Sequence, residues 1–466
     1  MSVLDETQDS TPTRSPLWPA VISGVYTVIV LVLLIRGLSP ATGAVVMFGP
    51  LLAVLVLLHP RLMFYGLAFV TAFAPYIKVP YTPIPLILVF AAGGWLALVI
   101  GAKGTRIRIG WLEWTMGLLA LCAFASLSTF GLSFAAFQEY GAWLAPTIVA
   151  LLLTYVSGPV LLRFGRVFVW GAAAGAVVGA VLVALDPNGL YLAKLTVVGY
   201  SSSGDNGRLV PGLEGANTLR LTSTYVEPNI AGLALLLGLI LAVALFEGPR
   251  RIVLSVVIAA GLTLTLSRSA IGTIVVAAVL VLVTSKAARK VKIGILATGV
   301  VGVLVALLVP VVHQRLFNSF GAGDTGTNAR VQAFQDFSNL VSGHWIFGLG
   351  WVRDEFREVT VGVTVNFVAN TPLLTIYRGG LVTAIPFVIL LIACLLRGWR
   401  VLRHGTTQGG ILAAGLIAFI LVALQLDFPV VTQSPATTVF AILIGFVAHP
   451  MFNPPPRSRP IEAGDG

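Results

Sequence analysis

Long apolar runs alternate with short polar segments along most of the chain, and this pattern predicts membrane-spanning helices. A run of about 20 residues has the length of an α-helix that crosses the hydrocarbon layer of a bilayer. Such runs are too long for the strands of a membrane barrel, the other structure that satisfies its backbone in lipid. We predict an all-α polytopic membrane protein with about 12–14 transmembrane helices, since some short runs are open to merging or re-entry. The apolar runs lie near 18–37, 42–58, 62–79, 83–101, 113–130, 137–156, 162–185, 228–246, 251–266, 269–285, 291–312, 371–396, 409–427 and 435–450.

The composition agrees with this pattern and excludes a soluble protein. Hydrophobic residues make up 57% of the 466 residues and charged residues only 10%, with a mean hydropathy of +0.96. The two cysteines, Cys122 and Cys394, each lie inside an apolar run. They offer neither a disulfide framework nor a thiolate metal site, so we expect packing roles for both.

The two ends of the chain differ from the apolar part between them. Residues 1–17 are polar and acidic and lack the basic start of a signal peptide, so the first apolar run is expected to stay as a membrane helix. Residues 451–466 have the composition of a disordered tail. We therefore predict one polytopic domain over residues 18–450, between two disordered cytoplasmic tails.

The positions of Lys and Arg predict how the chain crosses the membrane. If the N-terminus is cytoplasmic, most of the 29 basic residues fall in cytoplasmic loops, such as 103–108, 286–292 and 397–403. The positive-inside rule then favours a cytoplasmic location for both termini. The net charge of +11 is thus a signal of topology, and we expect no nucleic-acid partner. Only two long segments remain outside the cytoplasm in this arrangement, residues 186–227 and 313–370.

Arg268 lies in a short Ser-Arg-Ser turn between two apolar runs. An ionisable side chain near the hydrocarbon is expensive, so its presence there is a hypothesis of a functional site. The alternative is an arginine that snorkels to the interface and marks it. Snorkelling residues are usual on the basic cytoplasmic side, whereas Arg268 is predicted outside, and the two interpretations stay open.

The first outer segment ends with Arg220 and, seven residues later, with the sequence Glu227-Pro228-Asn229 before an apolar run. Pro228 suits the first position of a helix, and Glu227 would face the positive end of that helix. A capped helix start is the simplest interpretation. A functional one is favoured by Arg220, because planar guanidinium groups suit phosphate oxygens and Arg220 is predicted on the same side as Arg268.

The second outer segment carries Arg330, then His344 before glycines at 348 and 350, and ends with Asn370. Glycines between aromatic residues predict a tight turn packed on the membrane surface. The chain has five histidines and shows no cluster at metal-ligand spacing, so we expect no metal site and no cofactor.

The order of these motifs resembles the bacterial O-antigen ligase and polymerase family over roughly residues 205–400. The resemblance implies a glycosyltransferase with a GT-C-like architecture in the bacterial inner membrane. Its donor would be a glycan on an undecaprenyl-diphosphate carrier, used at the outer face without a metal ion, and its acceptor a glycan or glycolipid. Arg220 and Arg268 fall where the family holds the diphosphate and are the implied catalytic residues. The implied substrate-binding residues are Arg330, Asn370, Glu227, Asn229 and His344.

One position departs from the family. Ligases of the family carry a histidine, the presumed base, immediately before the asparagine, and this chain has Ala369 there. His344 lies where the family often has a histidine before the Gly-x-Gly turn, so it does not simply take over the role. Other candidates for the base are Glu227, Glu214, Asp336 and Asp354, and their spacing does not choose among them.

Two other classes of function stay open. One is a transporter or flippase of a lipid-linked glycan, although transporters usually place charged sites near the bilayer midplane, often in repeated halves. The other is a family member without activity that serves as an assembly partner, which the missing histidine motivates. Ala369, in place of the histidine of the family's ligases, slightly favours a polymerase-like or divergent enzyme over a ligase.

Overall fold

The computed structural model describes most of the predicted membrane domain. The predicted helices at 18–37 and 42–58, the one at 291–312 and most of the segment 313–370 lie outside the described residues. The described residues are 58–80, 84–101, 109–129, 133–186, 194–200, 209–211, 217–284, 337–351, 370–425 and 434–452, with the isolated positions 54, 191, 289, 292–294 and 334–335.

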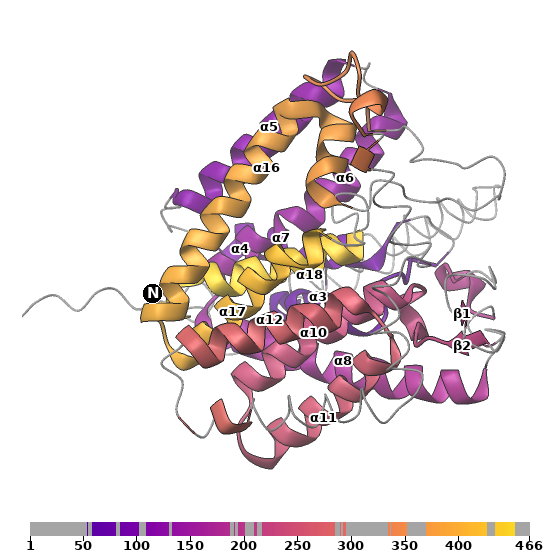
Figure 1. The fold of residues 1–466 in the computed structure, drawn as a ribbon, viewed down its shortest axis with the longest axis vertical. Helices are drawn as coiled ribbons and strands as arrows, with labels where there is room; N and C mark the ends of the chain where they lie inside the picture. The colour runs from indigo at the N-terminus through magenta and orange to yellow at the C-terminus, as the bar shows by residue number, and fades with distance from the viewer. Residues whose placement is uncertain are drawn as a thin grey trace, which may run out of the picture.

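The described part of the chain is a bundle of apolar helices (Figure 1), which confirms the all-α polytopic membrane fold. Five spans in it are long and apolar enough to cross a membrane. They are α5 (Trp111–Thr129), the pair α6 (Phe134–Thr147) and α7 (Val149–Tyr155), α8 (Gly158–Leu185), α10 (Pro228–Leu245) and α16 (Thr371–His404). Other apolar helices are α3 (Pro60–Phe73), α4 (Leu86–Gly101), α11 (Gly248–Leu264), α12 (Arg268–Thr284), α17 (Thr407–Leu421) and α18 (Ser434–Ala448).

The predicted span over 137–156 is confirmed by the span Ala135–Tyr155, which contains an interruption that the sequence did not predict. Helix α6 contains Pro146 and ends at Thr147, and Ile148 links it to α7. Proline has no N–H to donate and its ring clashes with the preceding turn, which breaks the helix. The apolar pattern continues through the break, so hydropathy alone does not reveal it.

Helix α16 differs from its predicted range, 371–396, in length and in shape. It continues to His404, since its basic last turn extends beyond the apolar run that set the predicted end. Gly380 interrupts the helix with φ 64° and ψ −171°, a conformation that favours glycine. The residues before Gly380 form a short arm that turns away from the main part of α16 (Figure 1).

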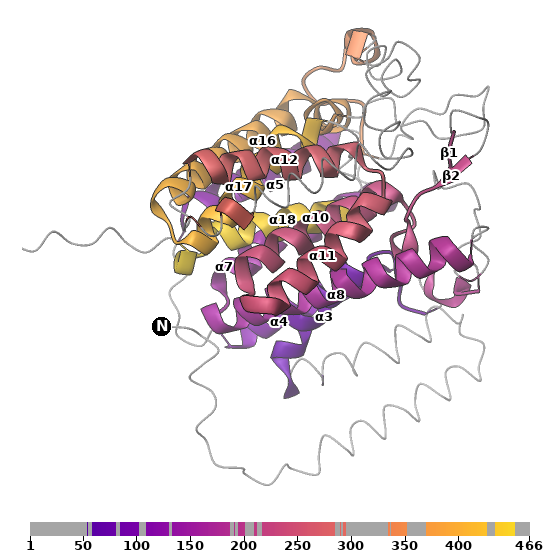
Figure 2. The same ribbon diagram turned by 60° about the horizontal axis from the view of Figure 1, so that its bottom comes forward.

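Helix α10 lies at the centre of the bundle, between α8 and α11 on one side and α12 and α17 on the other (Figure 2). Its hydrophobic residues surround the helix on all sides, as is typical of a buried helix. In its best membrane-spanning window 83% of the residues are buried. Small residues allow close approach, and a Cβ on Gly238 would lie 2.5 Å from the Cβ of Ala172 in α8.

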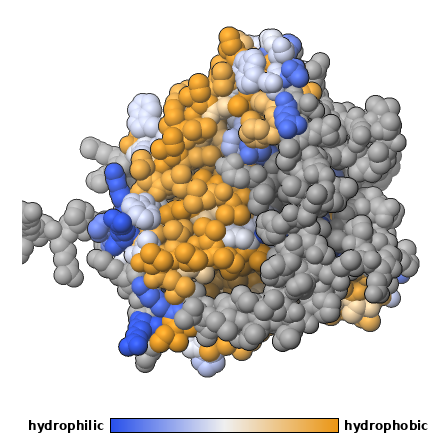
Figure 3. Space-filling model, viewed as in Figure 1, coloured by the Kyte–Doolittle hydropathy of each residue, from blue (hydrophilic) through white to orange (hydrophobic). Residues whose placement is uncertain are grey.

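The outer surface over α5 and α16 is broadly apolar, with hydrophilic residues towards the ends of the molecule (Figure 3). Leu121 is 70% exposed and Ile385 is 55% exposed. Patches of this extent on a soluble protein would mark an interaction surface. Here they form the surface that lipid tails contact.

A small hairpin precedes the first candidate site residue. Strands β1 (Leu209–Pro211) and β2 (Asn217–Leu219) are antiparallel, with Leu209 opposite Leu219. The hairpin lies beyond the C-terminal end of α8 (Figure 1), and Arg220 directly follows it.

Candidate functional site at one end of the bundle

The segment after the hairpin is fastened to the C-terminal end of α3. The Thr224 hydroxyl donates to the carbonyl of Phe73, and the Tyr225 hydroxyl donates to the carbonyl of Ala72. The Tyr200 hydroxyl donates in turn to the carbonyl of Thr224 at 2.8 Å. Parts of the predicted outer segment 186–227 therefore lie over one end of the bundle and are held there by buried side chains.

Arg220 joins this segment to the turn that contains Arg268. Its side chain is only 8% exposed. Its Nε donates to the carbonyl of Thr265 at 2.9 Å, and its Nη2 donates to Oδ1 of Asn229 at 2.8 Å. The neighbouring Leu221 N–H donates to the carbonyl of Leu264 at 2.9 Å. A buried guanidinium thus bridges the start of α10 and the end of α11.

Arg268 is the first residue of α12 and is partly buried. In the turn before it, the Ser267 N–H donates to the hydroxyl of Thr265 at 3.2 Å, and both residues are buried. The first turns of α10 pack on this turn, where a Cβ on Gly232 would lie 2.9 Å from the Cβ of Ser267. The N-termini of α10 and α12 therefore lie side by side, each close to an arginine.

Two residues with strained backbone conformations lie in the segments around Arg220 and Arg268. Val226 has φ 62° and Leu266 has φ 50°, and they are the non-glycine residues with positive φ in the described part of the chain. Positive φ is a genuine outlier for a β-branched residue. Each such residue costs about 1–3 kcal/mol, and this strain tends to occur at functional sites. Both lie in the segments that Arg220 bridges.

Glu227 is the N-cap residue of α10, and Pro228 occupies the first turn as predicted. The Glu227 side chain makes no capping hydrogen bond, although its carbonyl accepts from the Ala231 N–H at 3.0 Å. Tyr76 lies in the segment that follows α3. Burial, together with the negative charge of Glu227, raises the pKa of the Tyr76 hydroxyl well above its ordinary value. The carboxylate and the phenol are therefore close enough to interact.

The predicted Gly-x-Gly turn is confirmed and docks on the short arm of α16. Gly348 has φ 76° and Gly350 has φ 104°. The Leu349 N–H donates to the carbonyl of Tyr377 at 2.7 Å, and the Gly350 N–H donates to the carbonyl of Arg378 at 3.1 Å. A Cβ on Gly348 would lie 2.6 Å from that Arg378 oxygen, so the close approach requires glycine there.

The same turn also contacts α5 and α6. The Ser126 hydroxyl of α5 donates to the carbonyl of Phe347 at 2.8 Å. Trp351 is 3% exposed and its ring lies 5.2 Å from that of Trp143 and 5.8 Å from that of Tyr140. Gly348, Gly350 and Trp351 are thus part of the packed end of the bundle, whereas Ile346 and Phe347 before them remain exposed.

His344 and Asn370 belong to this second assembly. His344 precedes the turn and is exposed, and its carbonyl accepts from the Gly348 N–H at 2.8 Å. Asn370 is the N-cap of α16, where its Oδ1 accepts from the Leu373 N–H at 3.1 Å. The structure gives Asn370 a capping role that the sequence analysis did not consider. Arg330 lies outside the described residues, as do Ala369, Glu214, Asp336 and Asp354.

Arg378 is a candidate that the sequence analysis missed. It lies in the short arm of α16 and is 8% exposed. The signal was available, because an arginine two residues before Gly380 interrupts an apolar run just as Arg268 does. The apolar pattern of 371–396 conceals it, since this pattern predicts one uninterrupted helix.

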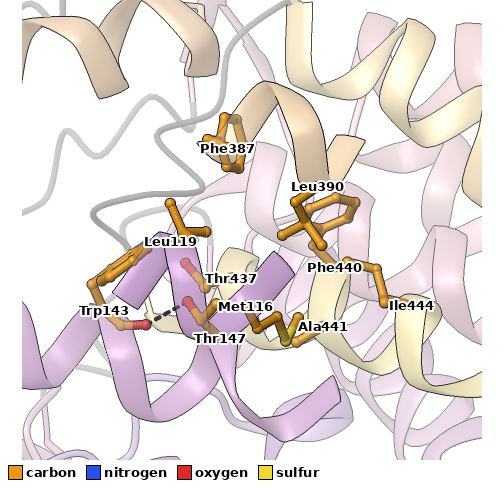
Figure 4. A pocket seen from close by; sticks show the side chains of 10 residues that line it. All are labelled: Met116, Leu119, Trp143, Thr147, Phe387, Leu390, Thr437, Phe440, Ala441 and Ile444. Carbon is orange, nitrogen blue, oxygen red and sulfur yellow. Dashed lines mark hydrogen bonds between the residues drawn. The ribbon is translucent and has the colours of Figure 1, made fainter. Parts of the chain in front are cut away.

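An apolar hollow lies between α5, α6, α16 and α18 (Figure 4). The hollow is small, with a volume of about 20 Å³, and the Thr147 hydroxyl at its wall donates to the carbonyl of Trp143 at 2.7 Å. Its lining offers no ionisable group for chemistry. It consists of Met116, Leu119, Trp143, Thr147, Phe387, Leu390, Thr437, Phe440, Ala441 and Ile444.

These features define the class of protein, a multi-pass membrane protein with arginines held at one end of a helical bundle. Residues 253–388 match the family model described as O-antigen ligase. This match supports an O-antigen ligase/polymerase-like family for the segment and confirms the resemblance that the motifs predicted. No curated protein matches the chain.

The matched segment contains Arg268, His344 and Asn370, whereas Arg220 and Glu227 precede it. The hydrogen bond from Arg220 to Thr265 therefore connects the matched segment to a part of the chain outside it. The family supports a role in membrane glycan transfer in the bacterial inner membrane.

Proposed function

We propose that the protein is a glycosyltransferase that takes a glycan from a polyprenyl-diphosphate carrier at the outer face of the inner membrane. The observation that carries this proposal is the placement of Arg220. Its buried guanidinium is fixed between Thr265 and Asn229, next to the turn from which Arg268 begins α12. Two arginines near two adjacent helix N-termini create a positive site at one end of the bundle.

Such a site suits the departure of a diphosphate. When the bond between the anomeric carbon and the diphosphate oxygen breaks, the electron pair and the negative charge move to the diphosphate. Fixed donors in a low-dielectric site stabilise that charge as it develops, and losing one typically costs about 3–4 kcal/mol in the barrier. Arginine is suited to this task because it remains charged and presents a planar set of donors to phosphate oxygens.

The distribution of charge supports placing this site outside the cytoplasm. Arg163 near the start of α8, Arg250 at the start of α11 and Arg400 near the end of α16 lie at the helix ends opposite the Arg268 turn. The positive-inside rule assigns the basic ends to the cytoplasm, together with both termini. Polymerisation and ligation share the chemistry on the donor side and differ in the acceptor, so the proposal covers both.

A substitution of Arg268 tests the function. We expect Arg268→Ala to abolish glycan transfer from the carrier while the protein still inserts and folds, because the charge on the leaving diphosphate loses a fixed partner. The matched control is Arg250→Ala, which removes a basic residue from the opposite helix end. The measurement is transfer in proteoliposomes supplied with the polyprenyl-diphosphate glycan that accumulates in cells lacking the protein.

The assay also separates the alternative class of function. Release of free carrier diphosphate together with a glycan joined to a new acceptor supports a transferase. Movement of the intact carrier-linked glycan across the vesicle bilayer, without any change in glycan length, would instead identify a flippase and contradict the proposal.

A further inference from the structure

We propose that Glu227 is the proton acceptor for the acceptor hydroxyl, the role that the family histidine has where this chain carries Ala369. The inference rests on the proposed function and deepens it, because it assigns the proton-accepting group beside the arginines that are proposed to hold the diphosphate. Glu227 lies outside the segment that matches the family model.

Hydrogen bonds of the residues before and after Glu227 in the sequence fix the position of its backbone. Asn229, two residues later, accepts a hydrogen bond from Arg220 at 2.8 Å. Thr224 and Tyr225, just before it, are bonded to the end of α3. Glu227 is therefore fixed at the start of the helix whose Asn229 contacts the guanidinium proposed to hold the diphosphate. We place the approach of the acceptor hydroxyl at this helix start.

The Glu227 carboxylate is not used to cap its helix. Some N-cap residues of the described helices do cap theirs, since the side chains of Asn370 and Thr406 accept from backbone N–H groups of the first turn, whereas Glu247, like Glu227, makes no such bond. Glutamate is also not among the residues preferred at this position, which are Ser, Thr, Asp and Asn. Helix capping therefore does not account for an acidic side chain at this place.

Tyr76 supplies a hydroxyl next to the carboxylate. It lies three residues after Phe73, whose carbonyl accepts from Thr224, so the same bonds bring the two segments together. The raised pKa of Tyr76 keeps its phenol protonated at physiological pH and able to donate a hydrogen bond. A donor in this place can orient the Glu227 carboxylate, which makes Tyr76 a positioning residue.

The proposed step is balanced as follows. The acceptor hydroxyl transfers its proton to the Glu227 carboxylate while its oxygen forms a bond with the anomeric carbon. The bond from that carbon to the diphosphate oxygen breaks, and its electron pair stays with the carrier diphosphate. Glu227 then returns the proton to water, and neither oxidant nor reductant is involved.

The test compares Glu227→Gln with Glu247→Gln. Glu247 is a matched control because it is also a glutamate at an N-cap with proline in the first turn and no side-chain capping bond, at the other end of the bundle. We expect Glu227→Gln to lower kcat by about 10²–10⁴, the contribution of a general base, with KM for the donor unchanged. Glu247→Gln should keep the wild-type rate. A Glu227→Gln rate equal to wild type, or a change in donor KM alone, overturns the assignment.

Chemical rescue distinguishes a base from a structural residue. Glu227→Ala leaves space for a small carboxylate, so formate should restore part of the lost kcat if the missing group is a base. A correctly folded Glu227→Ala protein that formate does not rescue would contradict the proposal. Tyr76→Phe should lower kcat less than Glu227→Gln does and leave donor KM unchanged, and a loss equal to that of Glu227→Gln would contradict its role as a positioning residue.

The two proposals fail in different ways. If wild-type protein releases carrier diphosphate and Glu227→Gln does so equally fast, the base assignment is wrong and the transferase function stands. If wild-type protein releases none, while carrier-linked glycan crosses the bilayer, both are wrong.

Discussion

At the scale of single residues, the site depends on where a few arginines are fixed. Arg220 makes its bonds with Nε and Nη2, which reach a carbonyl and an amide oxygen on two different segments. Charged hydrogen bonds of this kind contribute more than neutral ones, and leaving their buried partners unsatisfied is costly. Arg220 therefore has a structural role as well as the proposed catalytic one.

Replacing Arg220 with lysine separates these two roles. Lysine keeps the charge but lacks the planar fork, so it cannot reach Thr265 and Asn229 in the same way. We expect Arg220→Lys to lower the free energy of unfolding by about 1–3 kcal/mol, the typical cost of a buried polar group without its partner. Glycan transfer should fall as well. Thermal unfolding in detergent measures the first effect and the proteoliposome assay the second, with Arg251→Lys as the control. An unchanged melting temperature would show that the two hydrogen bonds of Arg220 contribute little to stability.

The sequence can select candidate site residues, but it does not predict the contacts that these residues make. Arg268 and Arg220 could be selected because a charge beside an apolar run is costly. The bond between Arg220 and Thr265 spans 45 positions, and no local pattern encodes such a pairing. Arg378 was missed because hydropathy averages a single charge over a long window.

At the scale of elements, two helices are interrupted, and the interruption in α16 shapes the site end of the bundle. Helix α16 turns at Gly380, and the Gly-x-Gly turn fits against the residues before it. Hydropathy predicted both α16 and the pair α6 and α7, because burial in lipid requires apolar residues whether or not the helix is straight. The breaks depend instead on single residues, Pro146 and Gly380, which change the average hydropathy very little.

We expect Gly380→Ala to disrupt the contact between α16 and the Gly-x-Gly turn. A Cβ at this position would lie 2.2 Å from the carbonyl oxygen of Ile346, and φ is 64° there. With ψ −171° the backbone lies in a region essentially restricted to glycine, which costs another residue about 1–3 kcal/mol, and the clash adds to it. The matched control is Gly117→Ala in α5, where a Cβ meets nothing within 4 Å.

The two variants should change stability in opposite directions. Alanine at an open helical position is favourable by roughly 0.8–1 kcal/mol relative to glycine, so Gly117→Ala should melt at or above the wild-type temperature. Thermal unfolding of both proteins in detergent provides the comparison. Equal melting of Gly380→Ala and wild type would mean that the turn is not fixed by this contact.

At the scale of the whole molecule, the apolar surface and the basic helix ends agree on how the protein lies in the membrane. The surface over α5 and α16 is apolar (Figure 3), and the basic residues of α8, α11 and α16 lie at helix ends away from the Arg268 turn. This arrangement exposes the proposed site to the face of the membrane opposite the basic loops.

Cysteine labelling tests this orientation. In a protein without Cys122 and Cys394, we expect a membrane-impermeant maleimide to label Lys194→Cys in intact spheroplasts and His404→Cys only after the membrane is opened. Both positions are exposed; Lys194 lies in the predicted outer segment, six residues before Tyr200, and His404 ends α16. Each variant serves as the control for the other. A low expression level reduces the labelling of a variant both before and after the membrane is opened, so it does not produce the expected difference between the two variants. Labelling of His404→Cys alone in intact spheroplasts would place the arginines in the cytoplasm. The positive-inside rule would then fail for this chain, and a donor presented at the outer face could not reach Arg268.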